Sequence, residues 1–281
     1  MTTTLRPTGP EERAEDGGRR RSFAIADNGR PVGALTLATD SRFAHRAGRL
    51  LDLTVEPAER RRGRGTVAVL AAEEVLRGWG CRQADATVDA DDEGALRLAT
   101  ALGYQPRGHL LTKELKEPPA PPPAGSVARP MAEAEFQDWL VEERASYTQS
   151  WVARGVPERW AAFRADTDVD GAFPEGLGSA GVLLRVLEHR GTPVGTCWLD
   201  LGRTHEERVE RGPMLFGVRV AEEQRGHGHG RTLLGVAEDL AAGSGAGRLT
   251  LHVFAGNVPA SRLYASLGFQ PIRLHLSKPL D

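Results

Sequence analysis

The sequence has little cysteine and no long apolar run. Its 281 residues include two cysteines, Cys81 and Cys197, which lie far apart and form no CxxC pair. This usage excludes a disulfide scaffold and a zinc ribbon, and it is typical of a reducing compartment. No 18 consecutive residues are apolar and uncharged, and the first 22 residues lack the apolar core of an export signal. We therefore expect a cytoplasmic protein without a membrane partner.

A net charge of one sign is also lacking. The chain has 36 Lys and Arg against 38 Asp and Glu, a formal net charge of -2. This balance provides no bulk field that would recruit nucleic acid or a membrane surface. The basic runs at 19–21 and 59–65 are local, and no strand pattern combines aromatic with basic residues. We expect no nucleic-acid partner.

Proline is concentrated in one segment, LKEPPAPPPAGS (115–126). Neither a helix nor a sheet ladder persists through such a segment, which is typical of a semi-rigid linker. A chain of this length is also long for a single domain. The predicted boundaries are a first domain at 1–115, a linker at 116–125 and a second domain at 126–281.

The two parts of the chain repeat each other. Residues 60–106 align with 225–271 at a constant offset of 165 without a gap, and 16 of the 47 positions are identical. Upstream matches continue at offsets of 162 and then 123, so the second copy carries 39 additional residues between its first two strands. A repeat of this length predicts two copies of one fold.

One repeat has the pattern of an α+β unit. In the second copy, 179–202 alternates around a turn at His189–Gly191, which predicts an antiparallel hairpin. A further strand leads to a glycine-rich loop, and the helix after this loop ends at Gly243. A strand, a short helix and a closing strand that completes the unit follow at 248–254, 258–268 and 269–276. We expect each copy to form a mixed, largely antiparallel sheet flanked by helices.

The glycine-rich loop lies within EEQRGHGHGRTLL (223–235). Small residues ahead of a helix present successive backbone N–H groups to one point, which suits a phosphate. A Walker loop is excluded because Gly230 is followed by Arg231 and Thr232. A Rossmann fingerprint fits poorly because Leu233 stands at its last glycine position.

The loop instead matches Arg-x-x-Gly-x-Gly at Arg225, Gly228 and Gly230, and the first copy repeats this pattern. Asn257 and Tyr264 follow in NVPASRLYASLGF. With these motifs the sequence resembles the GNAT superfamily of acetyl-CoA-dependent N-acetyltransferases, over nearly its whole length and as two tandem copies. The resemblance implies two GNAT-like domains, of which the N-terminal copy is truncated because it lacks the segment for the helices that cover the acceptor.

The resemblance implies a site for acetyl-CoA, the co-substrate, in the second copy. The strand backbone would bind the pantetheine arm, the loop amides would bind the pyrophosphate, and Asn257 would bond the arm or a water molecule. Tyr264 would face the thioester sulfur as the general acid. The residues implied to bind acetyl-CoA are Val218, Arg219, Val220, Arg225, Gly226, His227, Gly228, His229, Gly230, Arg231, Asn257 and Tyr264. The two histidines lack ligand spacing and acidic or cysteine neighbours, so we expect no metal.

The general base is not readable from the sequence. Many relatives place a glutamate on the strand that leads to the loop, but MLFGVRV contains none. The candidates are Glu142, Glu143, Asp200, His205 and Glu222. The first copy has Asp92 at the position of Asn257 and Ala99 at that of Tyr264, so it lacks the implied acid. We expect 1–115 to be mainly structural, with residual acetyl-CoA binding as the alternative.

Aromatic residues gather in the additional segment of the second copy, at Trp139, Tyr147, Trp151, Trp160 and Phe163. They either pack two helices onto the sheet or line a pocket for an amine. The expected reaction is acetyl transfer to the primary amine of a small molecule or peptide, by direct attack in a ternary complex. The alternatives are another acyl-CoA, an oxygen acceptor, or a non-catalytic acyl-CoA sensor. Both a monomer and a homodimer are compatible with the sequence.

Overall fold

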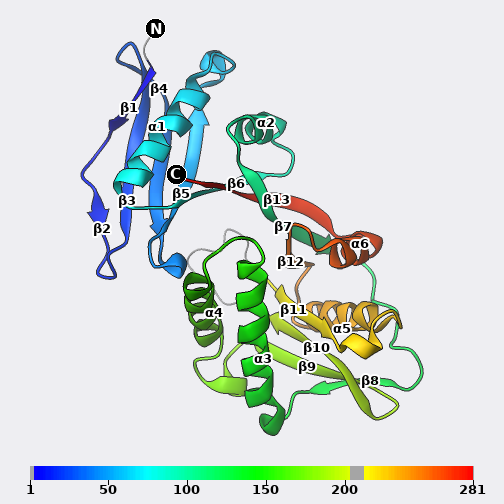
Figure 1. Ribbon diagram of the computed structural model, residues 1–281. Coiled ribbons are helices and arrows are strands. Elements are labelled where there is room, and N and C mark those ends of the chain that lie inside the picture. Colours follow the sequence, from blue (N-terminus) through cyan, green and yellow to red (C-terminus); the bar gives the residue numbers. More distant parts are fainter. Residues whose placement is uncertain (1–2, 203–211, 281) are drawn as a thin grey trace. The chain divides into compact units, whose positions relative to one another are not determined.

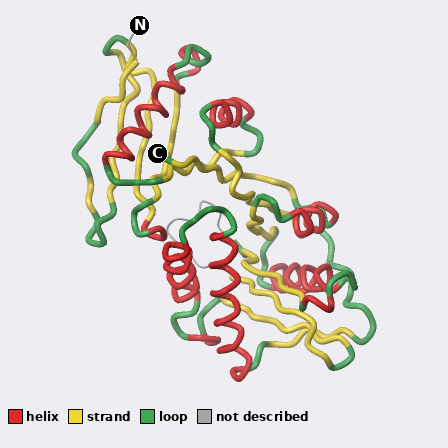
Figure 2. The backbone as a smooth tube through the Cα atoms, in the orientation of Figure 1, coloured by secondary structure: helices red, strands yellow, loops and turns green. Residues whose placement is uncertain are grey.

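The computed structural model describes residues 3–202 and 212–280, which fold into two compact units (Figure 1). Each unit consists of strands with helices packed against them (Figure 2). The units are discontinuous in sequence: unit 1 is 1–108, 149–164 and 273–281, and unit 2 is 109–148 and 165–272. No helix in the described ranges is both long and apolar enough to cross a membrane.

Unit 1 contains most of the first copy of the repeat. Its strands lie in the order β1-β3-β4-β5-β6-β13, with β2 paired to β3, and only the β5–β6 pair is parallel. Helix α1 covers one face, where its Leu76 packs among Leu35, Leu37 and Leu50 of the sheet. The bounds are β1 (Thr3–Pro7), β2 (Glu12–Arg13), β3 (Arg19–Asp27), β4 (Arg30–Asp40), β5 (Ala47–Val55), α1 (Arg64–Gly78), β6 (Gln83–Asp89), α2 (Glu93–Ala101) and β13 (Gln270–Pro279).

Unit 2 repeats this plan with more helix. Its strands lie in the order β7-β12-β11-β10-β9-β8, and β11–β12 is a parallel pair. Helix α5 buries Leu233 and Leu234 against one face, while α3 and α4 cover the other (Figure 1). The bounds are β7 (Gln105–Glu114), β8 (Ser126–Pro130), α3 (Glu133–Val152), α4 (Glu158–Ala172), β9 (Val182–His189), β10 (Thr192–Asp200), β11 (Met214–Val220), α5 (His229–Gly243), β12 (Arg248–Phe254) and α6 (Val258–Ser266).

The expected elements of the second copy are present, including the hairpin β9–β10 and the helix that ends at Gly243. Two of the clustered aromatic residues have packing roles. Trp139 contacts Trp198 edge-on at 5.8 Å in the core under α3. Trp151 contacts Phe43 at 5.3 Å within unit 1, where the Arg164 guanidinium lies 4.4 Å from its ring. For Trp139 the helix-packing interpretation is right, whereas the ring of Trp151 packs on Phe43, a residue of the first copy.

The two copies exchange their last strands. Residues 109–114 of β7 belong to unit 2, where Leu111 joins the core and the Leu115 N–H donates to the Gly247 carbonyl at 2.9 Å. Conversely, β13 pairs with β6 of unit 1 in the register Arg273↔Asp89 to Pro279↔Gln83. The expectation that the closing strand completes its own copy is wrong, because an apolar pattern predicts a strand but does not name its neighbour.

Two equivalent ion pairs accompany the exchange. Lys113 of β7 donates to both carboxylate oxygens of Glu238 on α5, each at 2.8 Å. Lys278 of β13 donates to those of Glu73 on α1 at 2.9 and 2.7 Å. Both the lysines and the glutamates are related by the repeat offset, and the glutamate side chains are only 4% and 2% exposed. Each buried carboxylate is therefore paired with a lysine from the other copy.

Charge reversal tests this exchange. Lys278→Glu places a second carboxylate against Glu73, and we expect the free energy of unfolding to fall by roughly 3–5 kcal/mol. Adding Glu73→Lys should recover most of the loss, because it restores an ion pair in unit 1. Adding Glu238→Lys instead is the matched control and should not recover it. Urea unfolding followed by circular dichroism measures the stability of all three variants. Rescue of Lys278→Glu by Glu238→Lys, and not by Glu73→Lys, would show that β13 pairs within its own copy.

Candidate functional site

Strands β11 and β12 diverge beside the glycine-rich loop. Their parallel register covers Met214↔Thr250 and Leu215↔Leu251, whereas β11 continues against β10 as far as Val220. Strands β5 and β6 of unit 1 part in the same way. Where the strands diverge, beyond Leu215 of β11, a wedge opens between β11 and β12. Backbone N–H and C=O groups along the edge of β11 face this wedge, and an extended ligand can hydrogen-bond to them.

The loop after β11 brings backbone amides to the start of α5. Gly226 and Gly228 have φ angles of 83° and 86°, and Gly228 is the helix N-cap without a side-chain hydrogen bond. This left-handed conformation favours glycine. The first amides of α5 therefore have no side-chain cap at the point where the helix dipole attracts an anion. Uncapped amides at a helix start are a general feature of anion sites, and binding of a phosphate here stays a prediction.

Gly230 has a different reason to be glycine. A Cβ atom built on it would lie 3.3 Å from Leu263 Cδ2 and 3.8 Å from Val220 Cγ2. The missing side chain thus lets α5 approach both α6 and β11. Arg231 strengthens this contact by donating from Nη2 to Ser266 Oγ on α6 at 2.8 Å. The loop, the end of β11 and α6 are consequently held together.

The other sequence-predicted residues are distributed around this junction. The Arg225 side chain is exposed and lies 3.7 Å from Glu222. Asn257 is the N-cap of α6 and accepts a hydrogen bond from the Ala260 N–H at 3.3 Å. Asp92 caps α2 in the same way in unit 1. Capping therefore accounts for the Asp/Asn exchange between the copies.

Tyr264 lies on α6, about two helical turns after the N-cap Asn257. It packs at the margin of the core beside Phe269, with ring centroids 5.9 Å apart. Burial raises the pKa of its phenol. Its counterpart Ala99 is buried in the core of unit 1. At this position of α6 and α2, a protonated phenol is therefore present in the second copy only.

The candidate bases have different environments. Asp200 is buried and accepts from the Gly202 N–H at 3.0 Å, while Glu222 pairs with Arg225 on the exposed loop. Glu142 and Glu143 of α3 both reach Arg219 of β11. His205 lies outside the described residues. Arg219 thus faces α3, a placement that the repeat pattern did not predict.

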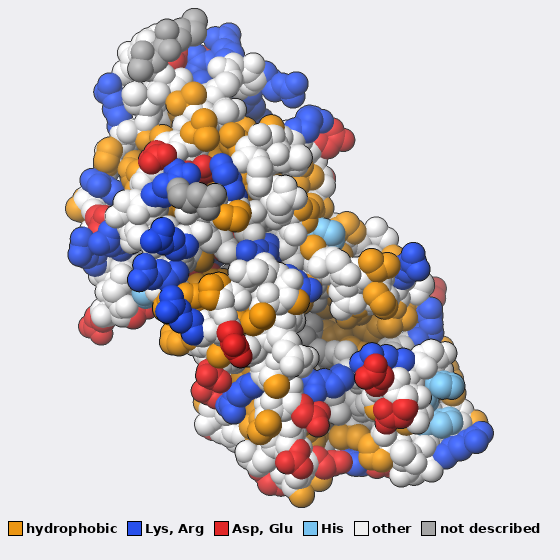
Figure 3. Space-filling view, in the orientation of Figure 1, with side chains coloured by type: hydrophobic (Ala, Val, Ile, Leu, Met, Phe, Trp, Pro, Cys, Tyr) orange, Lys and Arg blue, Asp and Glu red, His pale blue; other side chains and the backbone are white. Residues whose placement is uncertain are grey.

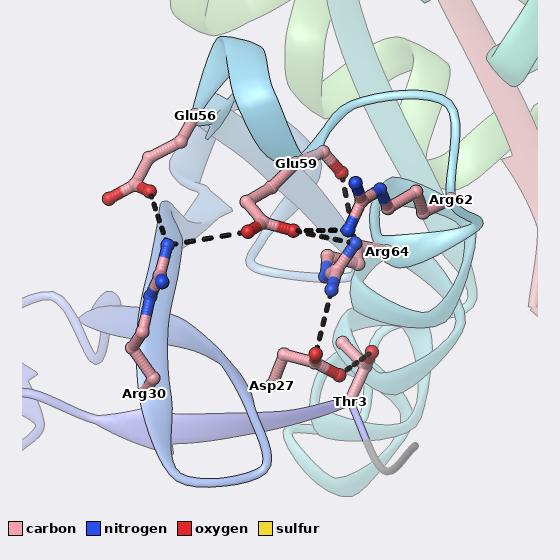
Figure 4. Close-up of polar contacts among 7 residues, drawn as sticks. All are labelled: Thr3, Asp27, Arg30, Glu56, Glu59, Arg62 and Arg64. Atoms are coloured by element: carbon pink, nitrogen blue, oxygen red, sulfur yellow. Dashed lines mark hydrogen bonds and ion pairs between the residues drawn. The ribbon is translucent and has the colours of Figure 1, made fainter.

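The corresponding loop of unit 1 is held by an ionic network that the sequence reasoning missed (Figure 4). Arg64, whose side chain is only 5% exposed, donates to Asp27 at 2.7 Å and lies 2.9 Å from Glu59. Thr3 donates to Asp27 at 3.4 Å, and Arg30 also reaches Glu59. The network fixes the start of α1 to the β3–β4 hairpin and leaves no titratable imidazole there.

Unit 2 has histidines at the equivalent positions. His229 replaces Arg64 and is buried, and His189 replaces Asp27, with the two rings 5.3 Å apart. Ser126 replaces Thr3 and lies 2.9 Å from His189 Nδ1. Histidine side chains, in pale blue, are visible on the surface of this unit in Figure 3. The offset register could have identified these substitutions if it had been extended to the hairpin.

His229 makes the stability of the loop depend on pH. Burial, then His189 and His227, lower its pKa below the ordinary value of 6.5. The unfolded chain then binds more protons than the folded one at mildly acidic pH, so stability contributed by neutral His229 is lost as pH falls below about 6.5.

His229→Gln tests this assignment. Between about pH 7.5 and pH 5.5, we expect the free energy of urea unfolding to decrease less for this variant than for the wild type. An equal decrease in both proteins would contradict this assignment.

Similarity to known proteins agrees with this geometry. The family model "Acetyltransferase (GNAT) family" matches residues 3–104 and 133–269. Mycothiol acetyltransferase of Clavibacter michiganensis subsp. michiganensis is 27% identical over 251 residues, covering 86% of this chain and 74% of that protein. Mycothiol acetyltransferase of Brachybacterium faecium is 29% identical over 222 residues, covering 77% of this chain and 63% of that protein.

Solved structures show the same fold. A GCN5-related N-acetyltransferase from Sphaerobacter thermophilus has a TM-score of 0.60 at 22% identity, covering 92% of this chain and 80% of its own. A tandem GNAT protein from the clavulanic acid biosynthesis pathway has a TM-score of 0.53 at 20% identity, covering 96% and 85%. Two copies of the motif, two diverging strand pairs and two matched regions lead to one conclusion: the chain belongs to the GNAT acetyltransferase family, as a tandem member.

Proposed function

We propose that the chain transfers an acetyl group from acetyl-CoA to a primary amine, by direct attack in a ternary complex, with the chemistry in the second copy at 126–281. The observation that carries this proposal is the junction of loop and α6 in unit 2. There an uncapped, glycine-rich helix start adjoins the helix that bears the phenol of Tyr264. The first copy retains the loop but has Ala99 at the phenol position.

The residues of unit 2 fit acetyl-CoA. The loop offers amides and the exposed Arg225 to a pyrophosphate, and the diverging edge of β11 offers backbone groups to an extended amide chain. Among the described residues, no group of three or more His, Cys, Asp or Glu side chains is arranged to hold a metal ion. The cofactor supplies the activated thioester, and the protein positions it against the amine.

Tyr264 is the proposed general acid. Attack of the amine nitrogen on the thioester carbonyl leads to cleavage of the C–S bond, and the departing thiolate needs a proton. Burial keeps the pKa of the Tyr264 phenol above its ordinary value, so the group carries its proton at neutral pH. A phenol near the sulfur can donate that proton as the bond breaks.

The acceptor is proposed as a small molecule or peptide with one primary amine. Relatives named mycothiol acetyltransferase make mycothiol-related amines the first compounds to test. Transfer of another acyl group, transfer to an oxygen acceptor, and acyl-CoA sensing without turnover are the alternatives. Incubation with acetyl-CoA and an amine panel, followed by mass spectrometry and thiol release, distinguishes them.

Tyr264→Phe tests the acid. We expect kcat to fall by about 10²–10⁴-fold, because the thiolate then leaves without its proton donor. The affinity for CoA, measured by calorimetry, should stay within about threefold of the wild-type value because phenylalanine retains the ring packing. An unchanged kcat in the variant would remove Tyr264 from this role.

A matched pair of glycine substitutions tests the division of labour. Gly63 and Gly228 are equivalent N-caps with φ angles of 76° and 86°, and neither has an atom within 4 Å of an added Cβ. Valine therefore strains both backbones similarly. We expect Gly228→Val to abolish acetyl-CoA binding and turnover and Gly63→Val to retain most activity. Comparable loss from Gly63→Val, in a protein that still melts cooperatively, would contradict a structural role for the first copy.

A further inference from the structure

Two glutamates of α3 reach down onto the strand that borders the wedge. Arg219 of β11 donates from Nη1 to Glu142 at 3.1 Å and from Nη2 to Glu143 at 2.5 Å. Its neighbours Val218 and Val220 pack on the opposite side, against the core under α5. Arg219 and the two glutamates therefore form a charged cluster on the α3 side of β11.

The two glutamates are not equivalent. The Glu142 side chain is 68% exposed, whereas that of Glu143 is 18% exposed. Glu143 Oε1 also lies 3.9 Å from the position of a Cβ atom built on Gly217. Gly217 is two residues beyond Leu215, the last β11 residue in register with β12. The Glu143 carboxylate is thus the one that lies on the strand backbone where the wedge opens.

The charge of the cluster is suited to one cation. Two carboxylates and one guanidinium give a formal charge of -1, which a single ammonium group would neutralise. Burial raises the pKa of the Glu143 carboxyl, although the charge and hydrogen bond of Arg219 oppose the shift. A carboxylate with a raised pKa is a better proton acceptor near neutral pH than an exposed one.

We propose that Glu143 binds the ammonium group of the acceptor at the mouth of the wedge and removes one of its protons. The inference rests on the acetyl transfer proposed above and names its base and its acceptor class, an amine with a single positive charge. In this proposal, a glutamate of helix α3 takes the role of the strand glutamate that β11 lacks.

The proton transfers balance in the proposed step. One N–H proton passes to the Glu143 carboxylate, and the freed lone pair forms the new C–N bond at the thioester carbonyl. The C–S bond then breaks, and the thiolate takes the proton of Tyr264. Glu143 returns its proton to solvent, the amide nitrogen loses its remaining surplus proton to solvent, and Tyr264 is reprotonated from solvent. Arg219 does not touch the reacting atoms and is a positioning residue for the carboxylate.

Glu143→Gln tests the base with little change in shape. For an amine that the wild type acetylates, we expect kcat/KM for the acceptor to fall by about 10²–10⁴-fold. The affinity for acetyl-CoA should be unchanged. In the wild type, kcat/KM should rise with pH as Glu143 ionises. In the variant this rise should disappear, and kcat/KM should then increase only with the fraction of the acceptor that is an uncharged amine. Glu143→Asp should retain the rise at reduced rate.

Asp138→Asn is the matched control, because Asp138 is an exposed acid on the same helix. It should leave rate and profile unchanged, and thermal unfolding of each variant identifies loss of fold. Wild-type kcat/KM and an intact rise with pH in Glu143→Gln would overturn the inference while leaving acetyl transfer standing. Failure of the wild type to acetylate any amine would instead overturn the proposed function.

Discussion

A buried carboxylate on one helix of each unit requires a cation, and each receives it from the other copy. Glu73 lies on α1 and Glu238 on α5, the helices that cover the two cores. Lys278 pairs with Glu73, and Lys113 pairs with Glu238. Removing a carboxylate from water costs several kcal/mol unless a well-placed partner offsets it. The two lysines are repeat equivalents, and so are the two glutamates, so either lysine could neutralise either carboxylate. The ion pair therefore requires a closing strand in each sheet, but it does not by itself select which of the two strands joins it.

The two sheets hold equivalent loops that differ in chemistry. Both helices start at a left-handed glycine beside a diverging strand pair, so the same backbone frame is present twice. In unit 1 a buried Arg64 spans two carboxylates, whereas unit 2 has histidines at the corresponding places. The backbone frame is the same in both copies, while the side chains beside it differ: Arg64 with carboxylates in unit 1, and histidines in unit 2.

Much of the fold follows from local pattern. Alternation predicted the β9–β10 hairpin, helical spacing predicted α5, and the glycines predicted a loop ahead of α5. Among the proposed bases, the sequence could not separate Glu142 from Glu143, because adjacent residues share the same pattern. Their difference in exposure and their shared contact with Arg219 depend on how α3 crosses β11, over a distance of more than 70 residues in the chain.

The sequence by itself determined the duplication, the order of helices and strands, the two glycine-rich loops and the alanine that stands in the first copy at the position of Tyr264. These depend on contacts within a few turns or on residue identity alone. Tertiary structure decided which sheet each closing strand joins, which glutamate lies on the wedge and which side chain is buried under each loop. Such choices are made by packing between segments distant in the chain, for which a strand or a carboxylate carries no local label.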